Sequence, residues 1–173
     1  NVAAHYDLGN DFFRAFLDPT MTYSCAFFEE PEQGLEAAQR AKYSRILGKL
    51  DVSSSDHVLE IGCGWGGFAI HAAAHAGCRV TATTISQRQY EETRERVARA
   101  GLSGRIEVLL EDYRDLRGRY DKLVSVEMIE AVGAEYFASY FRSCNERLET
   151  GGAMLIQAIT IADQHFERTR KEV

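Results

Sequence analysis

The chain has 173 residues, of which 45% are hydrophobic, and its formal net charge is −6. This length suits one domain with a sizeable core. The acidic balance, without any lysine-rich or arginine-rich block, argues against a nucleic-acid partner. No apolar stretch approaches the ~18 residues of a membrane-spanning helix. Four scattered cysteines without a CxxC pair are typical of a reducing compartment, so we expect a cytoplasmic protein.

Helix-like and strand-like segments alternate along the chain from residue 35 onward. The spacing of apolar residues predicts helices over 35–50, 67–76, 86–101 and 134–148, and strands over 57–62, 78–85, 105–112, 120–127 and 153–161. Such alternation is typical of a doubly wound, mostly parallel α/β sheet, whose ligands bind beyond the carboxyl ends of the strands. The chain stops in a charged, helix-like segment without a capping signal, and we expect the C-terminal strands of the sheet to be missing.

A glycine-rich turn connects the first of these strands to its helix. The stretch "VLEIGCGWGGFAIHAAA" (58–74) places four glycines within six positions. Gly62 and Gly64 permit a tight turn and let a ligand approach bare backbone. Histidines at 71 and 75 have the spacing of a zinc pair, but no third ligand is evident, so we expect a partly exposed helix face and no metal site.

The spacing of Gly62, Gly64 and Gly67 also matches the GxGxxG pattern of dinucleotide-binding enzymes. Those enzymes need an acidic residue about 20 positions later, at the end of the second strand. Here that place reads "ATTISQ", without a carboxylate. Glu60 instead precedes the glycines and Asp112 closes the third strand, which suits a cofactor with a cationic amino-acid end and an adenine ring. This pattern favours S-adenosylmethionine over NAD.

Six ordered motifs resemble the cyclopropane-fatty-acid synthase family, which includes the mycolic-acid cyclopropane synthases. They are "HYDLGNDFF", "MTYSCAFF", "VLEIGCGWGGFA", "TTISQRQ", "EDYRDL" and "SVEMIEAVG", and the likeness covers nearly the whole chain. The resemblance implies a Rossmann-like class I methyltransferase fold that uses S-adenosylmethionine. The family also contains enzymes that leave a methyl or methylene branch, and some plant N-methyltransferases.

The resemblance also assigns residues to the cofactor. It implies that Tyr23 and Ser24 contact the methionine end, Gly62 and Gly64 line the middle, Thr84 and Gln89 hold the ribose, and Asp112 and Tyr113 flank the adenine. A hydroxyl and an amide can both hydrogen-bond sugar hydroxyls, which accounts for the absent carboxylate after the second strand.

Family members use a bound bicarbonate as the base, held by a cysteine backbone, a glutamate, a histidine, a tyrosine and an isoleucine backbone. Here the resemblance implies that Cys25 and Glu130 match the first two, and that the tyrosine segment would lie beyond Val173. Gln157 stands where the family has histidine, with Ile159 two residues later on the same face of the expected strand. An amide cannot act as a base but can still donate a hydrogen bond to bicarbonate. Glu127 could share this site or support it.

A lid is implied because residues 22–25 must reach the cofactor. We therefore expect residues 1–50 to form a helical lid segment of the same domain, and residues 51–173 to form the cofactor-binding core. The aromatic stretches "DFFRAFL" (11–17) and "CAFF" (25–28) fit either core or the wall of a lipid tunnel, and we expect a mixture of the two.

The function implied is transfer of a one-carbon unit from S-adenosylmethionine to the double bond of an unsaturated phospholipid acyl chain, giving a cyclopropane fatty acid. Gln157 keeps two alternatives open: a methylene- or methyl-branched product, and a cofactor-binding scaffold without catalysis. The expected partners are the acyl chain, a membrane surface contacted transiently and peripherally, and a second copy in a homo-oligomer.

Overall fold

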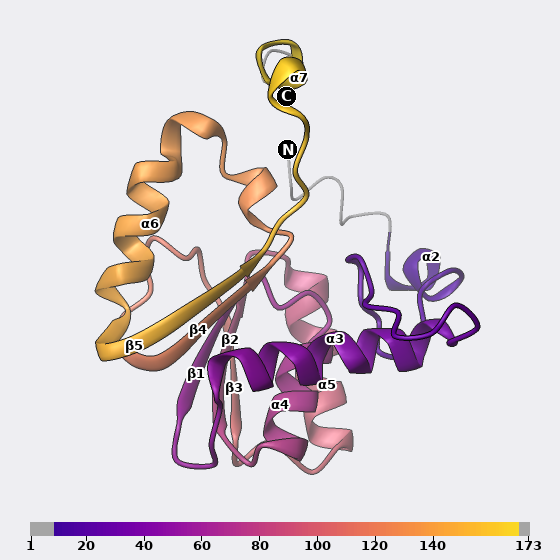
Figure 1. The fold of residues 1–173 in the computed structure, drawn as a ribbon. Helices are drawn as coiled ribbons and strands as arrows, with labels where there is room; N and C mark the ends of the chain where they lie inside the picture. Colours follow the sequence, from indigo (N-terminus) through magenta and orange to yellow (C-terminus); the bar gives the residue numbers. More distant parts are fainter. Residues whose placement is uncertain (1–8, 170–173) are drawn as a thin grey trace.

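The computed structural model describes residues 9–169, in which a parallel sheet carries helices on both faces (Figure 1). The strands are β1 (His57–Ile61), β2 (Arg79–Thr84), β3 (Ile106–Leu110), β4 (Tyr120–Val126) and β5 (Leu148–Gln157). The helices are α2 (Asn10–Arg14), α3 (Leu35–Leu50), α4 (Gly67–His75), α5 (Gln87–Arg99), α6 (Phe137–Glu146) and α7 (Asp163–Thr169), with short 3₁₀ turns η1 (Ile129–Ala131) and η2 (Ala134–Tyr136). No helix within this part of the chain is long and apolar enough to cross a bilayer.

The sheet has five strands in the order β3-β2-β1-β4-β5, and every neighbouring pair is parallel. The predicted α/β fold is therefore confirmed. The chain winds outward from β1 to β3 and then returns to place β4 on the other side of β1. Loops at the carboxyl ends of β1 and β4 therefore diverge, and this switch point is where open α/β sheets bind ligands.

Two core clusters lie on opposite faces of the sheet, because successive strand side chains point to opposite faces. Val58 belongs to the cluster formed with α3, α4 and α5, whereas Leu59 belongs to the cluster formed with Tyr140 and Cys144 of α6. Figure 1 shows α6 on one side of the sheet and α3, α4 and α5 on the other. Helix α3, predicted at these bounds from its spacing, contributes Tyr43, Ile46, Leu47 and Leu50 to the first cluster.

The N-terminal segment is attached to the helices beside the glycine-rich turn. Phe13 of α2 is buried with Met21 and Trp65 in a third apolar cluster. The indole Nε1 of Trp65 donates a hydrogen bond to Asn10 Oδ1 at 2.9 Å, and Arg14 forms an ion pair with Glu92 of α5. These contacts hold α2 near the turn. Residues 1–8 of the predicted lid, and residues 170–173 of the predicted core, lie outside the described residues.

The last predicted strand differs from the observed one at both ends. β5 starts at Leu148, five residues before the predicted start, because an irregular register opposite Tyr120 and Lys122 carries the strand through the turn-like sequence "ETGG". It ends at Gln157 because its partner β4 ends at Val126, which pairs with Gln157. The predicted helix over 134–148 is correspondingly shorter and begins as the 3₁₀ turn η2.

Candidate functional site

A cavity of about 470 Å³ lies at the carboxyl ends of β1, β2 and β4, where the N-terminal segment meets the sheet. All nine residues assigned to a cofactor line this one cavity: Tyr23, Ser24, Glu60, Gly62, Gly64, Thr84, Gln89, Asp112 and Tyr113. They come from five separate parts of the chain. The fold therefore brings the set together, while the contact that each residue makes with a ligand stays a prediction.

The two glycines of the turn differ in what faces them. Gly64 has a φ of +54°, and a Cβ built on it would meet no atom within 4 Å. Gly62 has a φ of +82°, and its Cβ would lie 2.9 Å from the Cγ of Met128. Both backbones favour glycine, but only Gly64 turns its bare side toward open space. Gly62 instead permits close packing against Met128.

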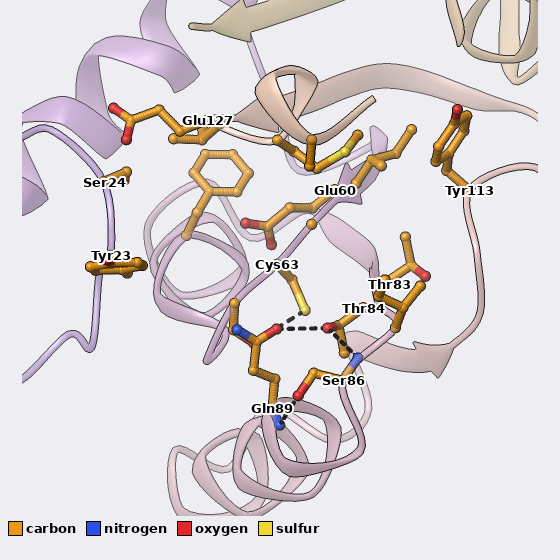
Figure 2. Close-up of a pocket in the computed structure, with 18 of the residues that line it drawn as sticks. Tyr23, Ser24, Glu60, Cys63, Thr83, Thr84, Ser86, Gln89, Tyr113 and Glu127 are labelled. Carbon is orange, nitrogen blue, oxygen red and sulfur yellow. Dashed lines mark hydrogen bonds between the residues drawn. The ribbon is translucent and has the colours of Figure 1, made fainter. Parts of the chain in front are cut away.

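Glu60 is the most unusual group in the cavity, because its carboxyl is buried and one of its oxygens has no partner. The residue is 4% exposed, and Oε2 has no hydrogen-bond partner among the described residues. Burial raises the pKa of this carboxyl to about 8, against opposing effects of the Ala69 backbone amide and of Lys42. Figure 2 shows Glu60 projecting into the middle of the cavity. A buried acceptor of this kind calls for a donor from a ligand, and a cation would favour its charged form.

A polar network closes the end of β2. Thr84 donates from Oγ1 to Gln89 Oε1 at 2.7 Å, and the backbone amide of Ser86 donates to Thr84 Oγ1 at 3.1 Å (Figure 2). Ser86 is also the N-cap of α5, as its sequence position predicts, and accepts from the amide of Gln89. These buried groups offer hydroxyl and amide contacts to a ligand without a negative charge.

Asp112 lies at the same edge, but a neighbour engages its carboxylate. Arg114 donates to Oδ1 from Nε at 2.8 Å and to Oδ2 from a terminal nitrogen at 2.7 Å. Hydrogen bonding to Arg114 lowers the pKa of Asp112. The ring of Tyr113 packs edge-on against that of Tyr140, with ring centroids 5.3 Å apart. A ligand that hydrogen-bonds to the Asp112 carboxylate must therefore share it with Arg114.

The four predicted catalytic residues and Glu127 form a second group, which we call the carboxylate corner: Cys25, Glu127, Glu130, Gln157 and Ile159. The backbone amide of Cys25 donates to Glu127 Oε1 at 2.8 Å, and Gln157 Nε2 donates to the same oxygen at 2.7 Å. Gln157 Nε2 also donates to the Cys25 carbonyl at 3.2 Å. Of these residues Glu127 lines the cavity, so the corner adjoins it.

Glu130 and Ile159 meet through the backbone. The amide of Ile159 donates to Glu130 Oε1 at 2.6 Å. The expectation that Ile159 lies in a strand on the same face as Gln157 is wrong, because β5 ends at Gln157 and Ile159 is 66% exposed. Glu130 thus holds the chain where it leaves the sheet.

Lys42 is a residue of this region that the sequence patterns did not single out. It is 3% exposed, and its Nζ donates to Ser24 Oγ at 2.6 Å and to the Cys25 carbonyl at 3.0 Å. Burial lowers its pKa to about 8. Its place in the sequence carried a signal, because Lys42 lies four residues after Ala38 and four before Ile46 on the buried face of α3.

One of the two histidines of α4 differs from expectation, whereas His75 is exposed as expected. His71 is buried rather than exposed, within hydrogen-bonding distance of Ser44 at 3.1 Å, and its ring stacks on that of His75. Burial lowers the pKa of His71 to about 4, which favours the neutral ring. Within residues 9–169 no group of three or more potential ligands could hold a metal ion.

Comparisons with known proteins identify the family of this chain. The mycolic acid cyclopropane synthetase family model matches residues 1–173. Tuberculostearic acid methyltransferase UfaA1 of Mycobacterium tuberculosis is 48% identical over 98% of this chain and 41% of its own length. Cyclopropane-fatty-acyl-phospholipid synthase of Escherichia coli is 43% identical over 90% of this chain and 39% of its own length.

Among solved structures, mycolic acid cyclopropane synthase CmaA1 complexed with SAH and CTAB superposes with a TM-score of 0.90. It is 37% identical, over 96% of this chain and 59% of that one. The chain spans about two fifths of the length of these curated relatives. Since the family model matches every residue, the chain belongs to the mycolic acid cyclopropane synthetase family.

Proposed function

We propose that this chain is the catalytic core of an enzyme that transfers a one-carbon unit from S-adenosylmethionine to the double bond of an unsaturated phospholipid acyl chain. The observation that carries the proposal is the cavity in which Gly64 offers open space and Glu60 a buried carboxyl oxygen, Oε2, without a hydrogen-bond partner among the described residues. Methyltransferases and cyclopropane synthases among the relatives support the reaction class.

The residues present fit the cofactor. The orphaned oxygen of Glu60 would accept from an ammonium group, and the bare backbone of Gly64 leaves room for the bulk of the ligand. Thr84 and Gln89 would face sugar hydroxyls, and Tyr113 would pack beside an adenine ring. The cavity volume lies within the range of about 300 to 1,000 Å³ for small-molecule sites. When bound, S-adenosylmethionine supplies an electrophilic methyl group on a sulfonium.

The N-terminal segment would exclude water from the reacting double bond. Transfer to an alkene leaves a carbocation on the acyl chain, which water would trap. We propose that residues 1–50 act as the lid over a core of residues 51–173, with Asn10 bonded to Trp65 and Arg14 paired with Glu92 as its fastenings.

The acyl chain would enter over exposed aromatic side chains near the cavity. Tyr23 and Tyr136 line the cavity and are 46% and 57% exposed. Phe12, Phe16 and Phe28 of the N-terminal segment are also exposed. Such rings suit contact with an acyl chain and, at their faces, with a cation. They also suit transient, peripheral contact with a membrane surface, which we propose as the source of the lipid.

Two products follow from the same cation. Loss of a proton from the added methyl group with ring closure gives a cyclopropane, which is the first candidate. Hydride shift before proton loss gives a methylene branch, which is the second. Both routes release one proton, and an amide cannot relay it as the family's histidine could, so Gln157 leaves both products open and requires another group to receive the proton.

The test is incubation of the purified protein with isotopically labelled S-adenosylmethionine and oleoyl phospholipid, followed by mass spectrometry and proton NMR of the fatty acids. A gain of one CH₂ supports catalysis, and upfield ring protons or vinylidene protons distinguish the two isomers. Cofactor binding without any lipid product would overturn the proposal in favour of a scaffold. Label transferred to a small amine instead would indicate N-methylation.

A further inference from the structure

Glu127 occupies a backbone conformation that side chains rarely adopt. It follows the end of β4 with a φ of +46°. Its backbone amide donates to the Gln157 carbonyl at 2.8 Å, so the residue is fixed to the end of β5. A non-glycine residue in this region is strained, and such strain concentrates at functional sites. The fold therefore holds this carboxylate at a defined place.

The side chain of Glu127 is held as firmly as its backbone. Its Oε1 accepts from the Cys25 amide and from Gln157, while Gln157 also bonds the Cys25 carbonyl. Lys42 donates to that same carbonyl at 3.0 Å and so also holds this segment. No residue between 9 and 169 donates to Oε2 in the hydrogen bonds of this structure, so this oxygen keeps its lone pairs for another partner.

These hydrogen bonds leave few free donors for a bound bicarbonate. The donors that the resemblance assigns to bicarbonate include the Cys25 amide, the side chain at 157 and the Ile159 amide. The Cys25 amide is bonded to Glu127, the two N–H groups of Gln157 are bonded to Glu127 and Cys25, and the Ile159 amide is bonded to Glu130. A second anion would have to displace Glu127 and then face its negative charge. The residues present do not fit bicarbonate.

We propose that Glu127 is itself the anion of this site and receives the proton released from the methylated acyl chain. This inference rests on the function proposed above. Glu127 and Ser24 both line the cavity, and Figure 2 shows the Glu127 side chain extending toward Ser24. The carboxylate thus lies beside the segment that the resemblance places at the methionine end of the cofactor.

The chemistry balances without a further reactant. The alkene electron pair forms the new C–C bond, the C–S pair stays with sulfur, and the acyl chain becomes a carbocation. A C–H electron pair then neutralises the cation, as a ring bond or a double bond, while the proton passes to the Glu127 carboxylate and on to solvent. A proton next to a carbocation is strongly acidic, so an ordinary carboxylate suffices when it is positioned within hydrogen-bond reach.

The decisive comparison is between the wild-type protein and the double variant E127G/Q157H. Glycine suits the φ of +46° at position 127, and removal of its carboxylate frees the Cys25 amide. We expect wild-type turnover to change less than twofold when dissolved CO₂ is removed. We expect the double variant to require added bicarbonate, and ¹³C NMR to detect labelled bicarbonate binding to the double variant alone.

A second variant distinguishes the role of Glu127 as a base from a purely structural role. Glu127→Gln retains an oxygen for the Cys25 amide, so S-adenosylmethionine affinity should stay within twofold while turnover falls about 100-fold. Glu149→Gln, an exposed carboxylate near the other end of β5, should change neither. Bicarbonate binding to the wild-type protein, or unchanged turnover in Glu127→Gln, would overturn the inference. If no protein forms a lipid product, the proposed function fails, and the NMR measurement still decides whether wild-type Glu127 excludes bicarbonate.

Discussion

The two parts of the site are built in different ways. The cofactor side is centred on one continuous turn, residues 60–67, whose glycines and buried carboxyl are fixed by local backbone geometry. The carboxylate corner joins Cys25, Glu127 and Gln157, which lie up to 132 positions apart in the chain. The first part offers open space and an unpartnered acceptor, whereas the second is filled by its own hydrogen bonds. The first part is therefore built to receive a ligand, and the second is built to hold a carboxylate in a fixed position.

The largest expected effect is on the cofactor side. Gly64→Val would place a branched side chain in the open space beside the turn, and we expect S-adenosylmethionine binding to weaken more than 100-fold by isothermal titration calorimetry. Gly101→Val is the matched control, since Gly101 also has a positive φ, +70°, and open space around its missing side chain. If the two variants are equally stable to heat and both still bind S-adenosylmethionine, the cofactor does not lie against Gly64.

The Glu60→Gln variant tests whether Glu60 Oε2, which has no hydrogen-bond partner among the described residues, binds the cofactor. A hydrogen bond to a charged partner contributes about 1.5–3 kcal/mol, so affinity for S-adenosylmethionine should fall roughly 10- to 100-fold. Glu107→Gln, an exposed carboxylate on β3, should leave affinity unchanged. An unaltered dissociation constant in Glu60→Gln would show that the ammonium binds elsewhere.

The pH dependence follows from the same residue. Because the pKa of Glu60 is raised to about 8, the carboxyl is neutral below that pH and must lose a proton to hold a cation. Wild-type affinity should therefore rise with pH up to about 8, with proton release measurable in buffers of different ionisation enthalpy. In the ligand-free protein the free energy of unfolding changes with pH in the opposite direction. The stabilising contribution of neutral Glu60 is lost as the pH rises from about 4.5 to 8. A wild-type affinity for S-adenosylmethionine that does not change with pH would contradict the assignment of Glu60 as the partner of the ammonium group.

Glu130→Gln tests the outer part of the carboxylate corner. The amide would still accept from Ile159 but would lack the charge, so we expect turnover to fall about tenfold with cofactor affinity nearly unchanged. Glu135→Gln, another exposed carboxylate at this edge, serves as the control. If the Glu130→Gln variant turns over as fast as the wild type, Glu130 takes no part in the reaction.

The smallest expected effect concerns Arg114, which occupies the Asp112 carboxylate. Exposed ion pairs contribute little net free energy, so Arg114→Ala should tighten S-adenosylmethionine binding by only about two- to fivefold, by freeing Asp112. Arg117→Ala nearby should have no effect. Weaker binding in Arg114→Ala would mean that Arg114 itself contacts the ligand.

The sequence could predict the cofactor side because its signals are local. The glycine spacing, the Ser86 cap and the apolar periodicity of α3 each determine structure within a few residues, and these elements were predicted closely. The corner was less accessible, because nothing near Glu127 in sequence indicates that Cys25 would bond it. The end of β5 was misplaced for a related reason: a strand ends where its partner ends, and Ile159 has no partner on β4.

The most direct test is a crystal structure of the protein grown with S-adenosylhomocysteine and bicarbonate together. We predict the nucleoside on the open side of Gly64, its ammonium against Glu60, and Glu127 still hydrogen-bonded to the Cys25 amide. A nucleoside outside this cavity would contradict the proposed cofactor site. A planar anion bonded to Cys25 and Gln157, with Glu127 turned away, would contradict the proposed role of Glu127.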